Sequence, residues 1–245
     1  MTMNLFAPRY VSFDIESARL LPPGVSDILA YRPLGISCAA AATSDGRDRR
    51  TWAGRNPDGS YAPRMSPDEA AAMVRDLMAY RNDGYTLVTW NGLGFDFDIL
   101  AEESGLHAEC VELAMNHIDM LFHAVCVLGH PISLQKATEG MEIEGKLAAM
   151  SGAEAPEAWA AGRFEEVLAY VQQDAAATVE LTQVCEERKE LAWITRTGKK
   201  RRMPLEDGWL NVKDASGLPL PDTSWMSDPP RRERFLSWVD HVPVR

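Results

Sequence analysis

The sequence has no clustered cysteines and no long apolar run. Its 245 residues hold four cysteines, widely scattered and without a C-x-x-C pair, so neither a zinc site nor a disulfide framework is indicated. The longest apolar runs, such as residues 38–42, are far shorter than a membrane span, and residues 1–10 lack the charged-then-apolar order of a secretory signal. These absences predict a soluble, cytoplasmic protein without membrane contact.

Positive charge is also scarce. Asp and Glu outnumber Lys and Arg by 36 to 25, which gives a formal net charge of −11. Charge of this sign argues against broad electrostatic binding to a polyanion such as nucleic acid. The local exception is RTGKKRR, residues 196–202, which holds five basic residues in seven. This run is either a solvated hairpin turn or a strip that contacts phosphates, and the sequence leaves both open.

The chain is long enough, and at 46% hydrophobic content apolar enough, for one sizeable α/β domain with an appendage. Three strands followed by a strand flanked by helices predict a mixed β-sheet with helices packed on it. We expect loops at 18–33 and 54–65, whose closure over a substrate the sequence leaves open. Strands are predicted at 10–17, 34–43, 49–54 and 84–90, and helices at 66–80, 95–105, 134–140 and 161–191.

The composition changes after residue 190. Four of the seven tryptophans fall in this tail, which is too aromatic to be disordered. It reads as a hairpin turned at Thr197 and Gly198, an irregular segment and a short closing helix near residues 231–239. We therefore divide the chain into a domain at 1–190 and a Trp-rich C-terminal extension at 191–245.

The first predicted strand, YVSFDIES at residues 10–17, carries two acids. Because side chains alternate across a strand, Asp14 and Glu16 lie on one face, with Phe13 and Ile15 on the other. Two neighbouring carboxylates repel one another, so this face requires solvent, a proton or a cation.

Two further acids can reach the same place. Asp96 stands at the start of the helix that follows the fourth strand, where backbone N–H groups favour negative charge. Asp174 lies four residues after Tyr170 on the long helix, so both side chains project from one helix face. With Asp14 and Glu16, these acids form a four-carboxylate cluster of the kind that fits Mg²⁺ or Mn²⁺.

Three motifs now stand in order along the chain: FDIE on a strand, NGLGFD at a strand-to-helix turn and YVQQD inside a helix. Each is weak alone, but their conjunction resembles the DEDD exonucleases of the ribonuclease H-like superfamily over roughly residues 9–185. The Tyr-x-x-x-Asp form is similar to the tyrosine branch, which includes the proofreading domains of family B polymerases. The alternative third motif is absent, because none of the five histidines precedes an Asp by four or five residues.

The resemblance implies a ribonuclease H-like α/β fold with a mixed sheet flanked by helices, and a small C-terminal extension. It implies a stand-alone 3′–5′ exonuclease that releases nucleoside 5′-monophosphates with two Mg²⁺ or Mn²⁺ ions. Asp14 would bridge the ions, Glu16 and Asp174 would hold the ion that carries the attacking water, and Asp96 would hold the other. Tyr170 would orient that water.

The partner implied is single-stranded nucleic acid or a 3′ end, with DNA preferred over RNA because the second motif is most similar to polymerase proofreading domains. The alternative is a non-catalytic nucleic-acid-binding or accessory subunit that keeps the fold. The tail tryptophans could also pack against a protein partner instead of stacking on bases.

Several residues near the motifs have other interpretations. Asp98 is a rival to Asp96 for the metal role, although the Phe-Asp alignment favours Asp96. Asp119 is expected to be structural or to stand behind the site, and Asn91 to be a turn residue. The segment GLGFDF is no dinucleotide fingerprint, because Phe97 replaces its third glycine.

Overall fold

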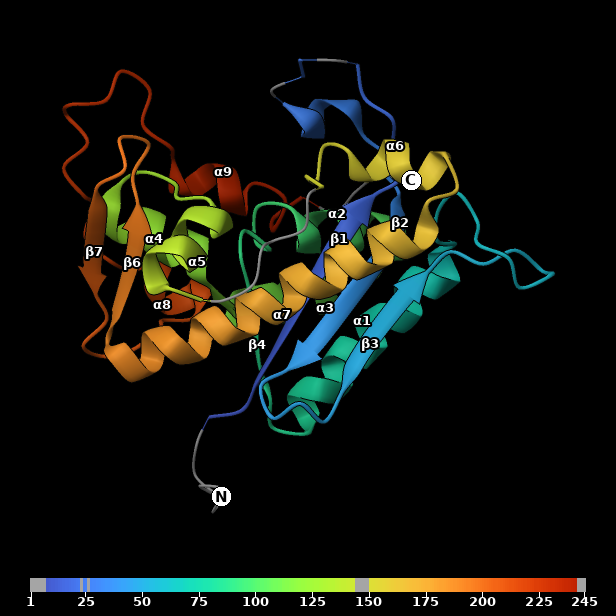
Figure 1. Cartoon of the computed structure of the whole chain (residues 1–245), viewed down its shortest axis with the longest axis horizontal. Helices are drawn as coiled ribbons and strands as arrows, with labels where there is room; N and C mark the ends of the chain where they lie inside the picture. The colour runs from blue at the N-terminus through green and yellow to red at the C-terminus, as the bar shows by residue number, and fades with distance from the viewer. Residues whose placement is uncertain (1–7, 23, 26, 144–149, 242–245) are drawn as a thin grey trace.

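The central feature of the fold is a five-stranded mixed sheet with strand order β3-β2-β1-β4-β5 (Figure 1). The computed structural model describes residues 8–22, 24–25, 27–143 and 150–241; the remaining parts of the expected domains lie outside the described residues. Strands β1, β2 and β3 are antiparallel neighbours, whereas β4 and β5 continue from β1 in parallel. The strands are β1 Tyr10–Ser17, β2 Ile36–Thr43, β3 Arg49–Ala53, β4 Thr86–Thr89 and β5 Ile118–Asp119.

Helices cover both faces of this sheet. Figure 1 shows the long helix α7 across one face of β1 and β2, with α1 behind the other face. The fold is thus the ribonuclease H-like α/β arrangement that the sequence predicts. The helices are η1 Ile28–Tyr31, α1 Pro67–Asn82, α2 Asp96–Ser104, α3 His107–Asn116, α4 Met120–Leu128, α5 Leu134–Met141, α6 Ala155–Ala160, α7 Phe164–Arg188, α8 Val212–Ser216 and α9 Arg232–Leu236.

Strand alternation separates the two faces of β1. Phe13 and Ile15 point into the larger apolar cluster, where Phe13 packs edge-on against Phe97 with ring centroids 4.8 Å apart. Asp14 and Glu16 therefore face α7. The neighbouring strand β2 is built of small residues, and those on the α7 side pack directly against the helix. Small side chains allow the backbone of α7 to lie close to the sheet.

Local signals fix most of the element ends. Ser66 caps α1, accepting from the Glu69 N–H while the Glu69 carboxylate accepts from the Ser66 N–H, which is the predicted capping box. Ser133 caps α5 as expected. The sequence also predicts a mostly helical stretch at 116–140, where α4 and α5 lie. The elements that were not predicted are η1, α3, α6, the two-residue strand β5 and the single-turn helix α8. Strand β5 and helix α8 are too short to show a hydrophobic period.

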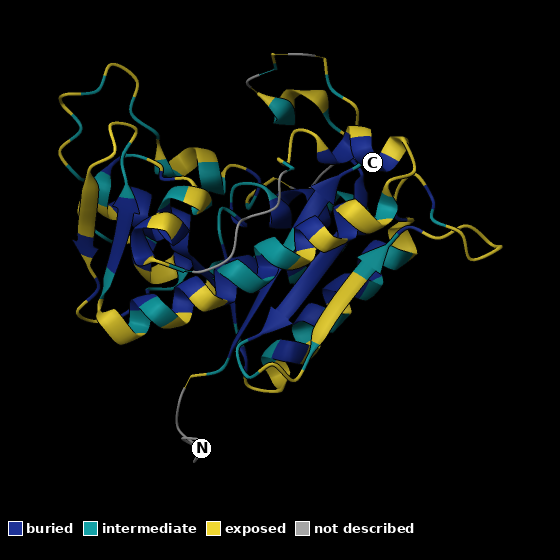
Figure 2. Cartoon of the chain, in the orientation of Figure 1, coloured by how far each residue is buried: buried dark blue, intermediate teal, exposed yellow. Residues whose placement is uncertain are grey.

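The tail beyond residue 190 forms the hairpin β6 Glu190–Ile194 and β7 Lys200–Pro204, and then α8 and α9. Trp193, Trp209 and Trp238 are each only 7% exposed and belong to the same two apolar clusters as β1 and β4. Trp225 is 67% exposed, and Figure 2 shows that the segment between α8 and α9 is largely exposed. Three of the four tail tryptophans are therefore committed to packing within the chain.

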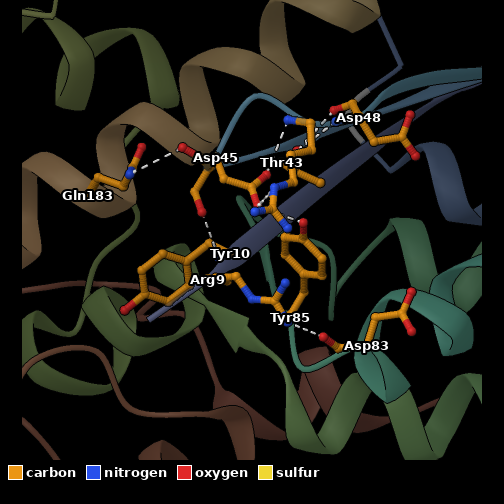
Figure 3. Close-up of polar contacts among 10 residues, drawn as sticks. Arg9, Tyr10, Thr43, Asp45, Asp48, Asp83, Tyr85 and Gln183 are labelled. Carbon is orange, nitrogen blue, oxygen red and sulfur yellow. Dashed lines mark hydrogen bonds and ion pairs between the residues drawn. The ribbon is translucent and has the colours of Figure 1, made fainter. Parts of the chain in front are cut away.

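A polar network fixes the beginning of β1 (Figure 3). The Arg9 guanidinium donates to the Asp83 carbonyl and lies 4.4 Å from the centroid of the Tyr85 ring. The Tyr85 hydroxyl donates to Asp45 Oδ2 at 2.8 Å.

Among the described residues, no helix is both long and apolar enough to cross a membrane.

Candidate active site

The five residues singled out in the sequence line one cavity of about 540 Å³ near the end of β1. They come from three elements that are far apart in the chain. Strand β1 supplies Asp14 and Glu16, α2 supplies Asp96 as its first residue, and α7 supplies Tyr170 and Asp174. The sheet and the two helices thus bring all five side chains to one place.

Asp96 is fixed to the backbone between the two strand acids. Its Oδ1 accepts a hydrogen bond from the Ile15 N–H at 3.0 Å, and Asp96 is only 4% exposed. Because Ile15 separates Asp14 from Glu16, this bond holds the third carboxylate beside the first two. The start of α2 also favours a negative charge at this position.

The position of Asp174 follows from the close packing of α7 on the sheet. The Ser12 hydroxyl, on the same face of β1 as the acids, donates to the Ala175 carbonyl at 2.5 Å. Asp174 accepts a hydrogen bond from the Tyr170 hydroxyl one turn earlier in the helix. Its Oδ1 is buried and has no hydrogen-bond partner among the residues that the structure describes. An unpartnered buried carboxylate oxygen costs free energy unless it binds a ligand or a proton.

Burial is the main cause of the unusual titration of this cluster. It raises the pKa of Asp14 well above its ordinary value, and the charges of Asp96, Glu16 and Asp174 raise it further. The pKa of Glu16 is raised by burial and then by Asp174 and Asp96.

Burial also raises the pKa values of the other two acids, Asp96 and Asp174. Burial raises the pKa of Asp96 to about 7, although the Ile15 N–H opposes the shift. Burial raises the pKa of Asp174 too, although the hydrogen bond from Tyr170 opposes this shift. Within the described part of the chain, none of the four acids forms an ion pair.

The donor set fits a hard divalent cation. Among the described residues, no group of three or more His, Cys, Asp or Glu side chains is already posed around a metal position. Four carboxylates that repel one another nevertheless supply only oxygen ligands, and Asp174 Oδ1 is free to ligate. A bound Mg²⁺ or Mn²⁺ would offset the repulsion and lower the raised pKa values.

Asp98, the rival of Asp96, does not line the cavity. It forms an ion pair with Arg32, whose Nη1 also donates to Glu102 Oε2 at 2.7 Å. Two residues along a helix point about 200° apart, so Asp96 and Asp98 necessarily face different surroundings. The geometry favours Asp96 over Asp98 for a role at the cavity.

Asp119 stands behind the site and holds the turn that carries Asn91. Its Oδ1 accepts from the N–H groups of Asn91 and Phe122 at 3.0 Å, and Oδ2 accepts from the Leu93 N–H at 2.9 Å. Asn91 has φ +76°, a conformation that non-glycine residues rarely adopt. The turn also needs Gly92, where a Cβ would lie 2.5 Å from Thr89 Oγ1.

The sequence did not point to the apolar wall of the cavity. The apolar part of the lining consists of residues that include Leu20, Leu21, Ile28, Trp90 and Phe95. Trp90 and Phe95 flank the NGLGFD motif, and that adjacency is the only signal in the sequence that could have identified them. One cavity thus offers both a charged face and an apolar face.

Comparison with known proteins supports the fold. The family model RNase_H_2, described as "RNase_H superfamily", matches residues 59–185. That segment contains Asp96, Tyr170 and Asp174, while Asp14 and Glu16 precede it. A search of curated proteins found no match. The family suggests a nuclease that acts on nucleic acid, and nucleases with this fold generally use divalent metals. Because the match covers more than half of the chain, the protein belongs to the RNase_H superfamily.

Proposed function

We propose that the protein is a metal-dependent 3′–5′ exonuclease of the DEDD class, in its tyrosine branch. It would hydrolyse phosphodiester bonds and release nucleoside 5′-monophosphates, with DNA preferred over RNA. The observation that carries the proposal is the convergence of Asp14, Glu16, Asp96 and Asp174 with Tyr170 at one cavity, where the four acids have no cationic partner among the described residues.

We assign the four acids to two ions. Asp14 has Asp96, Glu16 and Asp174 as its charged neighbours, which supports a role for it in holding both ions. Glu16 and Asp174 would hold one ion, and Asp96 would hold the other. When bound, the ions would acidify a water molecule and offset the negative charge that develops at phosphorus.

Tyr170 is suited to hold a proton, not to remove one. Burial and the neighbouring carboxylates, Asp174 first, raise the pKa of its hydroxyl above the ordinary value. The hydroxyl therefore stays protonated near neutral pH and donates to Asp174. We infer that Tyr170 orients the attacking water and that proton removal does not depend on it.

The apolar wall supports a nucleotide as the group that enters the cavity. A terminal nucleotide carries its charge on one side, at the phosphate, and presents an apolar base face on the other. Trp90 and Phe95 offer aromatic surface in the same cavity as the acids, and base–aromatic contacts of this kind are tolerant of sequence. A strand end of any sequence would then fit.

The test is degradation of 5′-labelled single-stranded DNA and RNA of the same sequence with Mg²⁺ or Mn²⁺. We expect a ladder that shortens from the 3′ end, is lost with EDTA and is lost in Asp14→Asn/Glu16→Gln. Asp98→Asn is the matched control, because Asp98 is paired with Arg32 away from the cavity, and it should cleave within about threefold of the wild-type rate. Absence of metal-dependent cleavage by folded wild-type protein would favour the accessory-subunit alternative.

A further inference from the structure

Positive charge is concentrated in the C-terminal tail. Residues 191–245 contain ten basic and seven acidic residues, whereas residues 1–190 contain 15 basic and 29 acidic residues. Half of the basic residues in the tail lie in the hairpin turn at 196–202. In a protein with net charge −11, this turn is the place where an approaching polyanion is repelled least.

Three of the hairpin cations have no acidic partner within the residues that the structure describes. Lys200 is paired with Glu142 at 2.7 Å, and Arg202 lies 3.6 Å from Glu190. Arg196, Lys199 and Arg201 are exposed and form no ion pair in that part of the chain. Their charges are therefore available to a ligand.

The hairpin turn itself is well defined. The Thr195 N–H donates to the Lys199 carbonyl at 2.8 Å, and the Lys199 N–H donates back to Thr195 Oγ1 at 3.0 Å. These bonds fix the backbone between Arg196 and Lys199. The cations thus project from a rigid support and not from a floppy tail, which reduces the entropy lost on binding.

An exposed tryptophan lies beside the hairpin. The ring of His130 lies 6.1 Å from both Trp193 and Trp225, and so links the buried ring of β6 to the exposed one. Trp193 is paired with Arg201 across the β6–β7 ladder, so their side chains share one face of the hairpin. Figure 1 shows the segment after α8 arching beside the hairpin, and Figure 2 shows that this segment and β7 are largely exposed, whereas β6 is buried.

This surface is connected to the cavity. Trp90, which lines the cavity, donates from Nε1 to the Ile132 carbonyl at 3.2 Å. Ile132 is two residues from His130, a separation of at most about 7 Å along the chain. These contacts lead from the cavity through Trp90 and Ile132 toward His130, whose ring contacts Trp225.

We propose that Arg196, Lys199, Arg201 and Trp225, together the hairpin–Trp225 surface, bind the single-stranded part of the substrate that lies 5′ of the nucleotide in the cavity. The cations contact phosphates and Trp225 stacks on a base, the combination that holds single strands without sequence preference. This inference rests on the proposed function, since it extends the substrate of that site. It also explains how an acidic nuclease keeps hold of a polyanion.

The test compares binding of a 5′-fluorescein-labelled 20-nucleotide oligo-dT strand, measured by anisotropy in EDTA so that nothing is cleaved. Arg196→Gln/Arg201→Gln should weaken binding about tenfold at 50 mM salt and reduce the slope of log affinity against log salt by about 1.4, for two lost phosphate contacts. Arg49→Gln/Arg75→Gln, which removes two exposed arginines from β3 and α1, is the matched control and should change neither.

Trp225 is tested separately. Trp225→Ala should weaken binding about fivefold or more, and Trp225→Phe should restore most of the loss, because a ring remains for stacking. Equal weakening by the hairpin pair and the control pair, or no effect of Trp225→Ala, would overturn the proposal. Because binding is measured without metal, failure of the exonuclease proposal would appear only in the cleavage assay with Mg²⁺ or Mn²⁺.

A short substrate provides the last check. Cleavage of a trinucleotide, which leaves at most two nucleotides outside the cavity, should be reduced less by Arg196→Gln/Arg201→Gln than cleavage of the 20-nucleotide strand. Equal loss of activity on the trinucleotide and on the 20-nucleotide strand would contradict a separate contact surface.

Discussion

The two ends of strand β1 carry acidic groups in opposite circumstances. At its start, burial is the largest single influence on the pKa of nearby Asp45 and raises it, but hydrogen bonds from Tyr85, the Arg47 N–H and Thr43 together outweigh burial and hold this pKa below its ordinary value (Figure 3). Near its other end, burial and like charges raise the pKa of Asp14 and Glu16. The first arrangement stabilises the fold, whereas the second costs stability. Acids kept without partners in a buried place point to a ligand.

The largest expected effect comes from removing one charge from the four-carboxylate cluster at the cavity. Asp174→Asn should reduce metal-dependent cleavage by on the order of 1000-fold, because a ligand to the cation is lost. The same change should leave metal-free stability unchanged or raise it, since it relieves repulsion and keeps an acceptor for Tyr170. Cleavage rates and urea unfolding in EDTA measure the two effects. Loss of both activity and stability would show that Asp174 is structural.

The pH dependence of stability should differ between the ends. An acid whose pKa is higher in the folded protein binds more protons there, so the free energy of unfolding falls as pH rises. For the four cavity acids this contribution is fully present below about pH 4, the unfolded range, and is lost as pH rises through the raised values, about 7 for Asp96.

We therefore expect metal-free protein to lose stability between pH 5 and pH 8, by about 1.4 kcal/mol for each unit by which a pKa is raised. Mn²⁺ should reverse the loss at pH 8 and have little effect at pH 5. Urea unfolding at both pH values, with EDTA or Mn²⁺, measures this. Asp14→Asn/Asp174→Asn should flatten the dependence, and equal slopes in wild type and variant would contradict the assignment.

The smallest effect is expected near the start of β1, where Asp45 accepts hydrogen bonds. Asp45→Asn weakens the hydrogen bond from Tyr85 and should lower the free energy of unfolding by about 1 kcal/mol. Cleavage should stay at the wild-type rate, because Asp45 lies at the opposite end of β1 from the cavity. A cleavage defect as large as that of Asp174→Asn would remove the distinction between the two ends.

Much of the fold could be predicted because its signals are local. The capping box at Ser66, the alternation in β1 and the turn at Gly198 each depend on a few neighbouring residues. Strand β5 and helix α8 lack such signals, since two and five residues are too few for a period. The sequence does not indicate which of the tail tryptophans are buried, because only tertiary packing distinguishes Trp238 from Trp225.

The candidate site was predicted in its residues but not in its surroundings. The Phe-Asp alignment already favoured Asp96 over Asp98, and the structure separates them further, because Asp96 lines the cavity while Asp98 is paired with Arg32. The role of Asp119 depends on three backbone N–H groups that converge through folding, which no linear pattern records. The domain division at residue 190 and the roles of the five cavity residues stay predictions.

The small residues of β2 on the α7 side have a consequence for engineering. Ala40 is paired with Asp14 across the β1–β2 ladder and lies under the helix that carries Asp174. A larger side chain there would act as a spacer and lift α7 from the sheet, which would widen the gap between carboxylates on different elements. The distance between the carboxylates could thus be adjusted through a residue that carries no charge and does not line the cavity.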